Sequence, residues 1–312
     1  MVYLDDKDIE QRILAEVADI HTTPTGAYNI RVNGKAQSRN STANIQITSR
    51  EDGSGININI KDGTKNETCC IPVVIAASGH KETVTNEFFI GEDCDVVIVA
   101  GCGIHNCGSQ DSEHHGMHRF HVGKNSHVKY LERHYGETEH GTSGGNIMNP
   151  STELFLEEGA HVEMETTQIR GIDSTRRSTS AEVKAGASIV IKERLLTNGT
   201  QFAESDLTAR LIGEDSSANI ISRSVATDNS RIKFVSNIVG AAPCSGHTEC
   251  DAIIAGDAKV LAVPALDADH PDAALIHEAA IGKIAGEQLM KLETLGLTAE
   301  EAEAAIIDGF LK

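Results

Sequence analysis

The chain has no tryptophan, and aromatic residues make up only 4% of its 312 residues. Stacking platforms for nucleic-acid bases or sugars are therefore not expected. Basic residues are also scarce, because 27 lysines and arginines stand against 46 aspartates and glutamates, a formal charge of −19. This charge repels phosphates, so the composition argues against a nucleic acid or an anionic membrane as partner. Neutral, cationic or protein partners are favoured.

Long apolar segments are absent as well. The longest apolar stretch, residues 71–77, is far shorter than the ~20 residues that a helix needs to cross a bilayer. The acidic start of the chain lacks the apolar core of a signal peptide. Without a secretion signal, the seven cysteines are expected to be reduced thiols. The sequence thus predicts a cytoplasmic protein with no membrane span.

The distribution of apolar residues divides the chain into three predicted parts, 1–27, 28–265 and 266–312. The first part contains a short helix, because Ile13 and Val17 belong to an apolar stripe at helical spacing. A helix with one apolar stripe has to pack on something. Its own domain and a partner protein are both open as the surface that it covers.

The last part, 266–312, is predicted to be a helical domain. Good helix formers fill residues 272–296, and Gly296 is a suitable residue to end that helix. Thr298 and Glu301 have the spacing of a capping box, which predicts the start of a second helix.

The middle part, 28–265, is predicted to consist of strands. Residues 43–49 and 55–61 alternate apolar and polar side chains with period two. A motif then recurs in which an apolar residue, a turn and an alternating strand follow one another. Its copies begin at Ile90, Val122, Leu156 and Val183, with a longer copy at Ile212 and a degenerate one at Ala226.

The spacing of these copies indicates the type of fold. From Val96 to Ile220, the residues that follow the turns lie 32, 34, 27 and 31 positions apart. Such repeats are typical of solenoids and propellers, in which neighbouring repeats cover each other's apolar faces. Each copy supplies two short strands, too few for a propeller blade, so a parallel β-helix fits better. A β-sandwich stays open, because irregular periods also suit Greek-key sheets.

Histidines are concentrated in one segment, since eight of the 14 lie between His105 and His140. Imidazole is a ligand of borderline metals, so transient metal binding is one interpretation. The spacing matches no closed metal site, and polar loops with solvated strand faces are the other interpretation. On a strand, His118 would share a face with Phe120, whereas His121 would point the opposite way.

A second candidate site lies near the C-terminal end. Cys250 is flanked by acids in the run GHTECDAII, and His277 and Glu278 lie in ALIHEAAIGK, at the start of the predicted helix. These residues could form a nucleophilic site in which histidine lowers the thiol pKa, as in a thiol hydrolase or transferase. They could equally offer sulfur, nitrogen and oxygen ligands to iron. A β-helical polysaccharide enzyme is disfavoured by the scarcity of aromatic residues.

The run HTECDAII and the later segment DHPDAALIHEAAIGKIAGEQLMKLETLGLTAEEAEAAIIDGF give the chain a recognisable resemblance. It resembles the SufB/SufD scaffold family of iron–sulfur cluster assembly over residues 70–312, more weakly in the repeats. The resemblance implies a mainly β fold, a right-handed parallel β-helix with a short N-terminal helix and a C-terminal helical domain. The repeats indicate the β-helix independently.

The resemblance also implies a site and partners. Cys250 matches the SufB-type cysteine implicated in sulfur receipt and cluster formation, and His277 and Glu278 match the adjoining His-Glu pair. These three residues would hold a transient iron–sulfur cluster, with a sulfur donor and apo-protein recipients. A SufC-like ABC-type ATPase is the expected partner, docking on 266–312, because this chain has no G-x-x-x-x-G-K-[ST] run. The chain is short for a SufB protein, so we expect a homodimer that acts as a scaffold and not as an enzyme.

Overall fold

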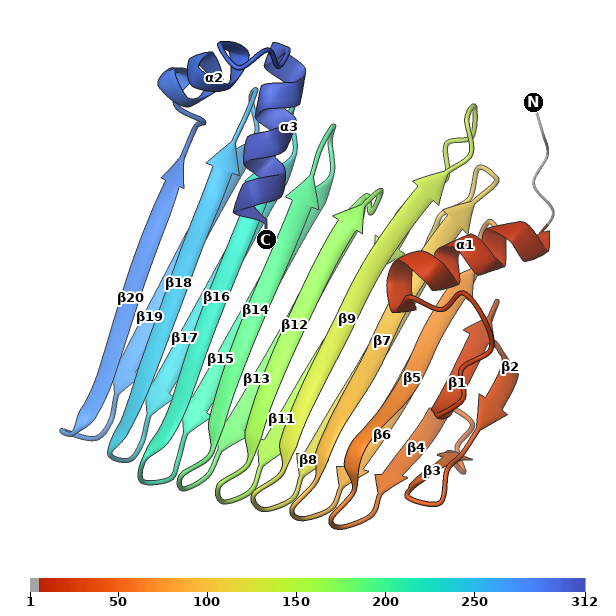
Figure 1. Ribbon diagram of the computed structural model, residues 1–312, viewed down its shortest axis with the longest axis vertical. Helices are drawn as coiled ribbons and strands as arrows, with labels where there is room; N and C mark the ends of the chain where they lie inside the picture. Colours follow the sequence, from red (N-terminus) through yellow and green to blue (C-terminus); the bar gives the residue numbers. More distant parts are fainter. Residues whose placement is uncertain (1–5, 312) are drawn as a thin grey trace.

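The structure is a computed structural model that describes residues 6–311. Most of the chain forms strands, which wind into a β-solenoid of about 8 turns with helices near both ends (Figure 1). The predicted mainly β fold built on a parallel β-helix is therefore confirmed. Residues 1–5, part of the acidic start that bears on a signal peptide, lie outside the described residues. No helix in the range 6–311 is long and apolar enough to cross a membrane.

Two 10-stranded sheets form the walls of the solenoid. In spatial order, the first sheet contains β2 (Lys35–Asn40), β1 (Ala27–Val32), β5 (Lys65–Ile75), β7 (Asp95–Asn106), β9 (His127–Thr138), β12 (His161–Arg170), β14 (Ser188–Thr197), β16 (Ser216–Ala226), β18 (Cys244–Ile254) and β20 (Ala273–Gly282). The second sheet contains β19 (Lys259–Ala268), β17 (Arg231–Gly240), β15 (Phe202–Leu211), β13 (Ser174–Val183), β10 (Asn146–Met148) with β11 (Ser151–Leu156), β8 (Ser112–Val122), β6 (Lys81–Ile90), β4 (Gly55–Ile60) and β3 (Ile45–Ser49).

Neighbouring coils stack so that their strands run parallel within each sheet. Among the strands of residues 6–311, only β1 with β2 and β3 with β4 pair in the antiparallel sense. A Greek-key sandwich consists of antiparallel sheets, so this pairing excludes the β-sandwich alternative.

The recurring turn forms one edge of the solenoid. In five of its six copies it leads from a second-sheet strand to a first-sheet strand. The third turn residue there has a positive φ, between 54° and 69°, which favours the residues found: Asp93, Asn125, Gly159, Gly186 and Asp215. The copy after Ala226 is different, because it leads from the first sheet to the second at the opposite edge.

The apolar residues that follow these turns stack inside the solenoid. One ladder position of the first sheet is occupied, coil after coil, by the buried side chains of Val96, Val128, Val162 and Ile189. In the next coil Ala218 continues this ladder, and Ile220 pairs instead with Ile191. The longer fifth turn therefore shifts the repeat by two residues.

Helix α1 (Asp6–Ala18) packs on the outer face of the first sheet, against β5, β7 and β9 (Figure 1). Ile13 and Val17 are fully buried in this contact, which confirms the predicted apolar stripe. Glycines of β7 allow the close approach, because a Cβ at Gly103 would lie 2.1 Å from Ile13 Cγ2. The helix therefore covers its own solenoid, the first of the two predicted alternatives.

The predicted helix over 272–296 is wrong in its first half. Residues Ala273–Gly282 form strand β20, which pairs with β18 along its length, and the helix α2 spans only Gly286–Glu293. Alanine-rich segments favour helix locally, but pairing with the edge of β18 overrides this propensity. Strands therefore continue past residue 265, and the predicted helical part 266–312 begins with β19 and β20 residues. The division into three domains otherwise stays a prediction.

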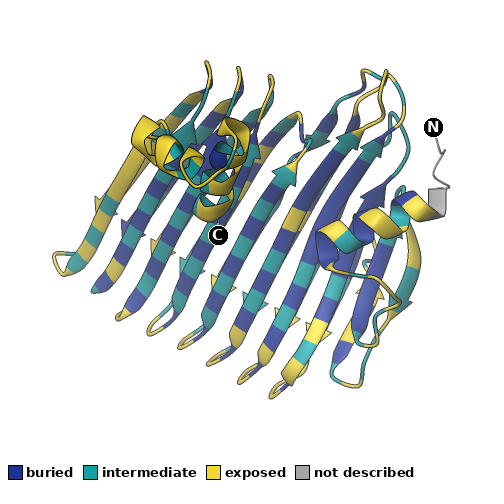
Figure 2. Ribbon diagram, turned by 45° about the horizontal axis from the view of Figure 1, so that its top comes forward, coloured by how far each residue is buried: buried dark blue, intermediate teal, exposed yellow. Residues whose placement is uncertain are grey.

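Helix α3 (Ala299–Phe310) begins at the predicted capping box. The Thr298 Oγ1 accepts a hydrogen bond from the Glu301 N–H at 3.2 Å, and the Glu301 carboxylate accepts one from the Thr298 N–H at 2.8 Å. Helix α2 buries none of its residues, and α3 buries only Ala302. The two helices lie at the C-terminal end of the solenoid with most of their surface exposed (Figure 2).

Candidate functional site

Cys250 lies in the middle of β18, and its side chain points into the solenoid, where it is fully buried. In the first sheet it pairs with Ser222 of the preceding coil and with Ala279 of the following one. Its chain neighbours Glu249 and Asp251 point to the outer face, because successive side chains of a strand alternate. The acids beside Cys250 in the sequence are thus on the other side of the sheet.

The surroundings of Cys250 keep its thiol protonated. Burial raises the pKa of Cys250 to about 12, and the negative charges of Glu193 and Asp251 add to this shift. Glu193 lies inside the solenoid in β14, where it accepts hydrogen bonds from the hydroxyls of Ser205 and Ser222. A neutral thiol is a weak nucleophile, but it can lose its proton when a metal ion binds.

His277 lies on the same inner face, in the last strand of the first sheet. It pairs with Thr248 in β18, two positions before the pair formed by Cys250 and Ala279. Its Nδ1 atom is buried and has no hydrogen-bond partner among the residues that the structure describes. A buried imidazole nitrogen without a partner is unfavourable, and a metal ion would satisfy it.

Glu278 points to the opposite face of β20. It pairs with Glu249 across the sheet, and its Oε2 lies 3.6 Å from His247 Nε2 on the outer surface. The prediction that His277 and Glu278 lie on a helix is wrong, since both belong to strand β20. On a helix adjacent residues lie about 100° apart, but on a strand they face opposite ways. The described chain therefore brings together Cys250 and His277, and places Glu278 across the sheet from them.

A group of buried ionisable side chains lies in the solenoid interior, where the sequence did not lead us to expect it. Glu132 and Arg177 form an ion pair with both side chains only 4% exposed, and Arg177 also lies within 3.5 Å of Glu193 and 3.1 Å of His134. Burial alone would raise the pKa of Glu132, but Arg177 and His134 hold it well below its usual range. The alternation of side chains along a strand could have indicated this, because Glu193 lies two residues after the apolar Ile191 and therefore on the same face.

The histidines of the histidine-rich segment point either into the solenoid or to its outer face, according to their position along the strands. His114, His118 and His134 point inward and are buried, and His118 Nδ1 lies 2.6 Å from the Tyr130 hydroxyl. His121 lies on the outer face with 41% of its side chain exposed, as the strand argument predicts. The interpretation as polar loops and solvated faces is therefore wrong for the three inward histidines. Burial lowers the pKa of His118 to about 4.

The fold and the site together define a parallel β-helix with a buried thiol and an unpartnered imidazole in its last coils. The family model described as "SUF system FeS cluster assembly, SufBD core domain" matches residues 89–310. The chain belongs to this SufBD family, which confirms the resemblance seen in the sequence. It is therefore a component of iron–sulfur cluster assembly.

Curated relatives support the same assignment. An iron–sulfur cluster assembly SufBD family protein of Pyrococcus horikoshii is 30% identical, over 87% of this chain and 82% of the relative. One of Archaeoglobus fulgidus is 28% identical, over 86% of this chain and 70% of the relative. A third, of Methanocaldococcus jannaschii, is 29% identical, over 76% of this chain and 74% of the relative.

Proposed function

We propose that this chain is a scaffold on which a nascent iron–sulfur cluster is built at Cys250, His277 and Glu278. Cys250 is the sulfur acceptor or iron ligand, and the other two residues supply further ligands or orient them. The cluster is cargo, assembled from a sulfur donor and passed on to apo-protein recipients. In this role the chain is not itself an enzyme.

The observation that carries the proposal is the placement of Cys250 and His277 on one inner face, with His277 Nδ1 lacking a partner. Thiolate and imidazole are both good ligands for iron. A site that must release its cluster requires fewer thiolates than the Cys₄ sets that hold resident clusters. One cysteine with nitrogen and oxygen ligands suits transfer better than four cysteines.

Glu278 is included because β20 is an edge strand. Within residues 6–311 no strand covers the outer edges of β19 and β20. A second copy that packs against this end would bring its own Cys250, His277 and Glu278 to the same junction and double the number of ligands. The scaffold would then be a homodimer whose site lies between the two copies.

A thiol hydrolase or transferase is the weaker alternative. Such enzymes need a thiolate with a lowered pKa that a substrate can reach. Cys250 is fully buried, and burial raises the pKa of its thiol. Both properties disfavour a nucleophile that attacks an external substrate, and for Cys250 they support the role of iron ligand over that of sulfur acceptor.

The energy source is proposed to be a separate ABC-type ATPase of the SufC kind. The sequence contains no phosphate-binding loop of the G-x-x-x-x-G-K-[ST] type, so ATP hydrolysis has to come from another chain. The exposed helices α2 and α3 supply a surface on which this ATPase could dock.

The test is anaerobic co-expression with a candidate ATPase, followed by iron and sulfide assays of the purified chain. Cys250→Ser should lose cluster formation, because a hydroxyl is a much weaker nucleophile and a poor ligand for soft metals. His277→Ala and Glu278→Ala should each lower the amount of cluster without abolishing it.

Cys244→Ser is the matched control. Cys244 lies on the same strand and the same inner face as Cys250. It pairs with Ala273, four residues before His277 on β20, and therefore lies farther from His277 than Cys250 does. This variant should retain the wild-type amounts of iron and sulfide. Equal cluster formation in Cys250→Ser and wild type would contradict the proposed site.

A further inference from the structure

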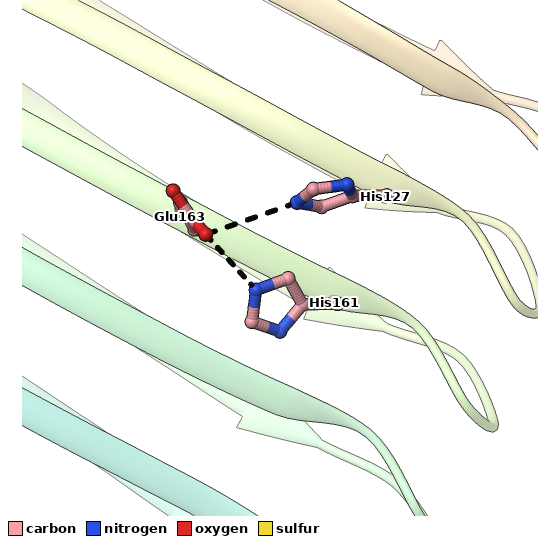
Figure 3. A group of neighbouring side chains, drawn as sticks. All are labelled: His127, His161 and Glu163. Atoms are coloured by element: carbon pink, nitrogen blue, oxygen red, sulfur yellow. Dashed lines mark ion pairs between the residues drawn. The ribbon is translucent and has the colours of Figure 1, made fainter. Parts of the chain in front are cut away.

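Two histidines and a glutamate meet on the outer face of the first sheet, away from Cys250. His127 and His161 are the first residues of β9 and β12 and pair with each other in the parallel ladder, and Glu163 lies two residues further along β12. All three side chains project from the same face toward one point (Figure 3). They lie beside the turns that connect the second sheet to the first.

The ligand atoms are close enough for one metal ion to bridge them. Glu163 Oε1 lies 3.5 Å from His161 Nε2 and 4.0 Å from His127 Nε2, and one ligand atom from each residue falls within 4.8 Å of the others. Tetrahedral ligands with bonds of about 2.1 Å are separated by roughly 3.4 Å. Small rotations of partly exposed side chains are therefore sufficient to close the site.

A hydrogen bond holds the His161 ring in a suitable orientation. His161 Nδ1 lies 2.6 Å from the Ser188 hydroxyl in the next coil, which turns Nε2 toward Glu163. Metal-binding histidines are commonly oriented in this way, by a partner on the ring nitrogen that does not bind the metal. His127 Nδ1 faces the Asp95 carboxylate of the preceding coil at 3.8 Å, which is longer than a hydrogen bond.

The carboxylate is available for such a role. The lysine that pairs with Glu163 across the sheet, Lys129, forms its ion pair with Glu165 at 3.3 Å instead. The groups that Glu163 faces within ion-pair distance are therefore the two imidazoles. A divalent cation bound between the three side chains would compensate the carboxylate charge.

We propose that His127, His161 and Glu163 form a surface site for a divalent transition-metal ion of the Zn²⁺ or Fe²⁺ class. Two imidazoles and one carboxylate favour these ions over Mg²⁺ and Ca²⁺, which prefer oxygen ligands alone. Water completes the coordination, because the site opens to solvent on one side. The ion joins β9 to β12 and so links two consecutive coils.

This inference does not rest on the proposed function of Cys250. Cys250 and His277 lie on the inner face of the first sheet and this site lies on its outer face, with strands β14 and β16 between β12 and β18. Metal binding at the outer site should therefore survive Cys250→Ser. Loss of cluster assembly and loss of this metal site are separate results.

The test is titration of the purified, reduced chain with Co²⁺, followed by visible absorption and calorimetry. We expect one Co²⁺ per chain with nitrogen and oxygen ligands, and loss of this ion in the double variant His127→Ala/His161→Ala. Glu163→Gln should weaken binding strongly, and Ser188→Ala by about tenfold, because it removes the partner that orients His161. Zn²⁺ should raise the unfolding temperature of wild type but not of the double variant.

His121→Ala is the matched control. His121 is a similarly exposed histidine that contacts Glu87 at 3.1 Å, but on the second sheet and without a second histidine in the group. It should bind Co²⁺ as wild type does, and circular dichroism should show all variants folded. Unchanged Co²⁺ stoichiometry in the double variant, or no binding by wild type, would overturn the proposal. Absorption bands of cobalt bound only to thiolate would do so too.

Discussion

The solenoid interior contains buried charged residues whose pairing affects the stability of the fold. Glu132 and Arg177 are almost completely buried, and each compensates the other's charge. A buried ion pair contributes little compared with an apolar pair, but the loss of one partner leaves an uncompensated charge in a medium of low dielectric constant. Glu193 and His134 also lie close to Arg177, so the guanidinium interacts with several polar side chains at once.

We predict that Glu132→Gln lowers the free energy of unfolding by about 3–5 kcal/mol at pH 7, because Arg177 then remains buried without its main counter-charge. The pKa of Glu132 is held below its usual value, so its contribution exists above about pH 4.3 and disappears as the pH falls toward the folded-state pKa. Chemical unfolding monitored by circular dichroism at pH 7 and at about pH 2.5, well below the unfolded-state pKa, measures both effects.

Glu153→Gln provides the comparison for that experiment. Glu153 forms an ion pair with Arg119 at 2.7 Å, but both side chains are about one-third exposed. Exposed pairs contribute about 0–1 kcal/mol, so this variant should unfold close to wild type. If Glu132→Gln were as stable as Glu153→Gln, the buried pair would not have the stabilising role described here.

At the scale of secondary-structure elements, the C-terminal helices bury very little of their surface. Strands such as β12 and β14 bury alternate side chains and α1 buries its apolar stripe, whereas α2 and α3 together bury only Ala302. Met290 and Leu295 remain exposed at the helix pair. Exposed apolar residues of this kind are typical of a surface that binds another protein.

If the proposed ATPase partner docks on this helix pair, deletion of residues 297–312 should abolish its co-purification while the solenoid stays folded. The deletion removes α3, which hardly contributes to the core, and leaves every strand intact. Pull-down with the ATPase measures binding, and circular dichroism measures the β-structure. Retained binding by a folded, truncated chain would place the interface elsewhere on the molecule.

At the scale of the whole molecule, the solenoid ends in a coil that nothing covers within residues 6–311. Leu266 and Ile281 occupy inward-facing positions of this coil, yet they are 39% and 42% exposed. One coil earlier, Ile238 and Ala252 fill the same ladder positions and are buried. The end of the solenoid is thus an apolar core surface open to solvent, which a second copy of the chain would cover.

We predict that Leu266→Asp/Ile281→Asp converts the proposed homodimer into a monomer, because charges at the end of the core oppose burial against a second copy. Light scattering coupled to size-exclusion chromatography gives the mass directly. Ile212→Asp, a similarly exposed residue in a turn away from this end, should leave the dimer intact. A wild-type monomer, or a dimer that survives the double substitution, would contradict the expected assembly.

Local patterns in the sequence were sufficient for most of the fold. Period-two alternation predicts strands because side chains of a strand alternate, and the turn motif predicts the solenoid because each corner needs a residue that tolerates positive φ. The capping box at Thr298 and the stripe of α1 were equally local, and the structure confirms both. Cys250, His277 and Glu278 were candidate site residues because of their side-chain chemistry. The family was recognisable from its sequence motifs.

Long-range contacts decided the rest. Residues 273–282 have the composition of a helix, and only the free edge of β18 makes them a strand, which sends His277 and Glu278 to opposite faces. Parity shows that two residues share a face, but not which face is inside when polar residues occupy both. The burial of Glu193 and His118, and the meeting of His127 with His161 across two coils, depend on strand pairing between distant segments. The sequence by itself therefore determined the β-helix and its candidate residues, whereas tertiary pairing decided which of them meet.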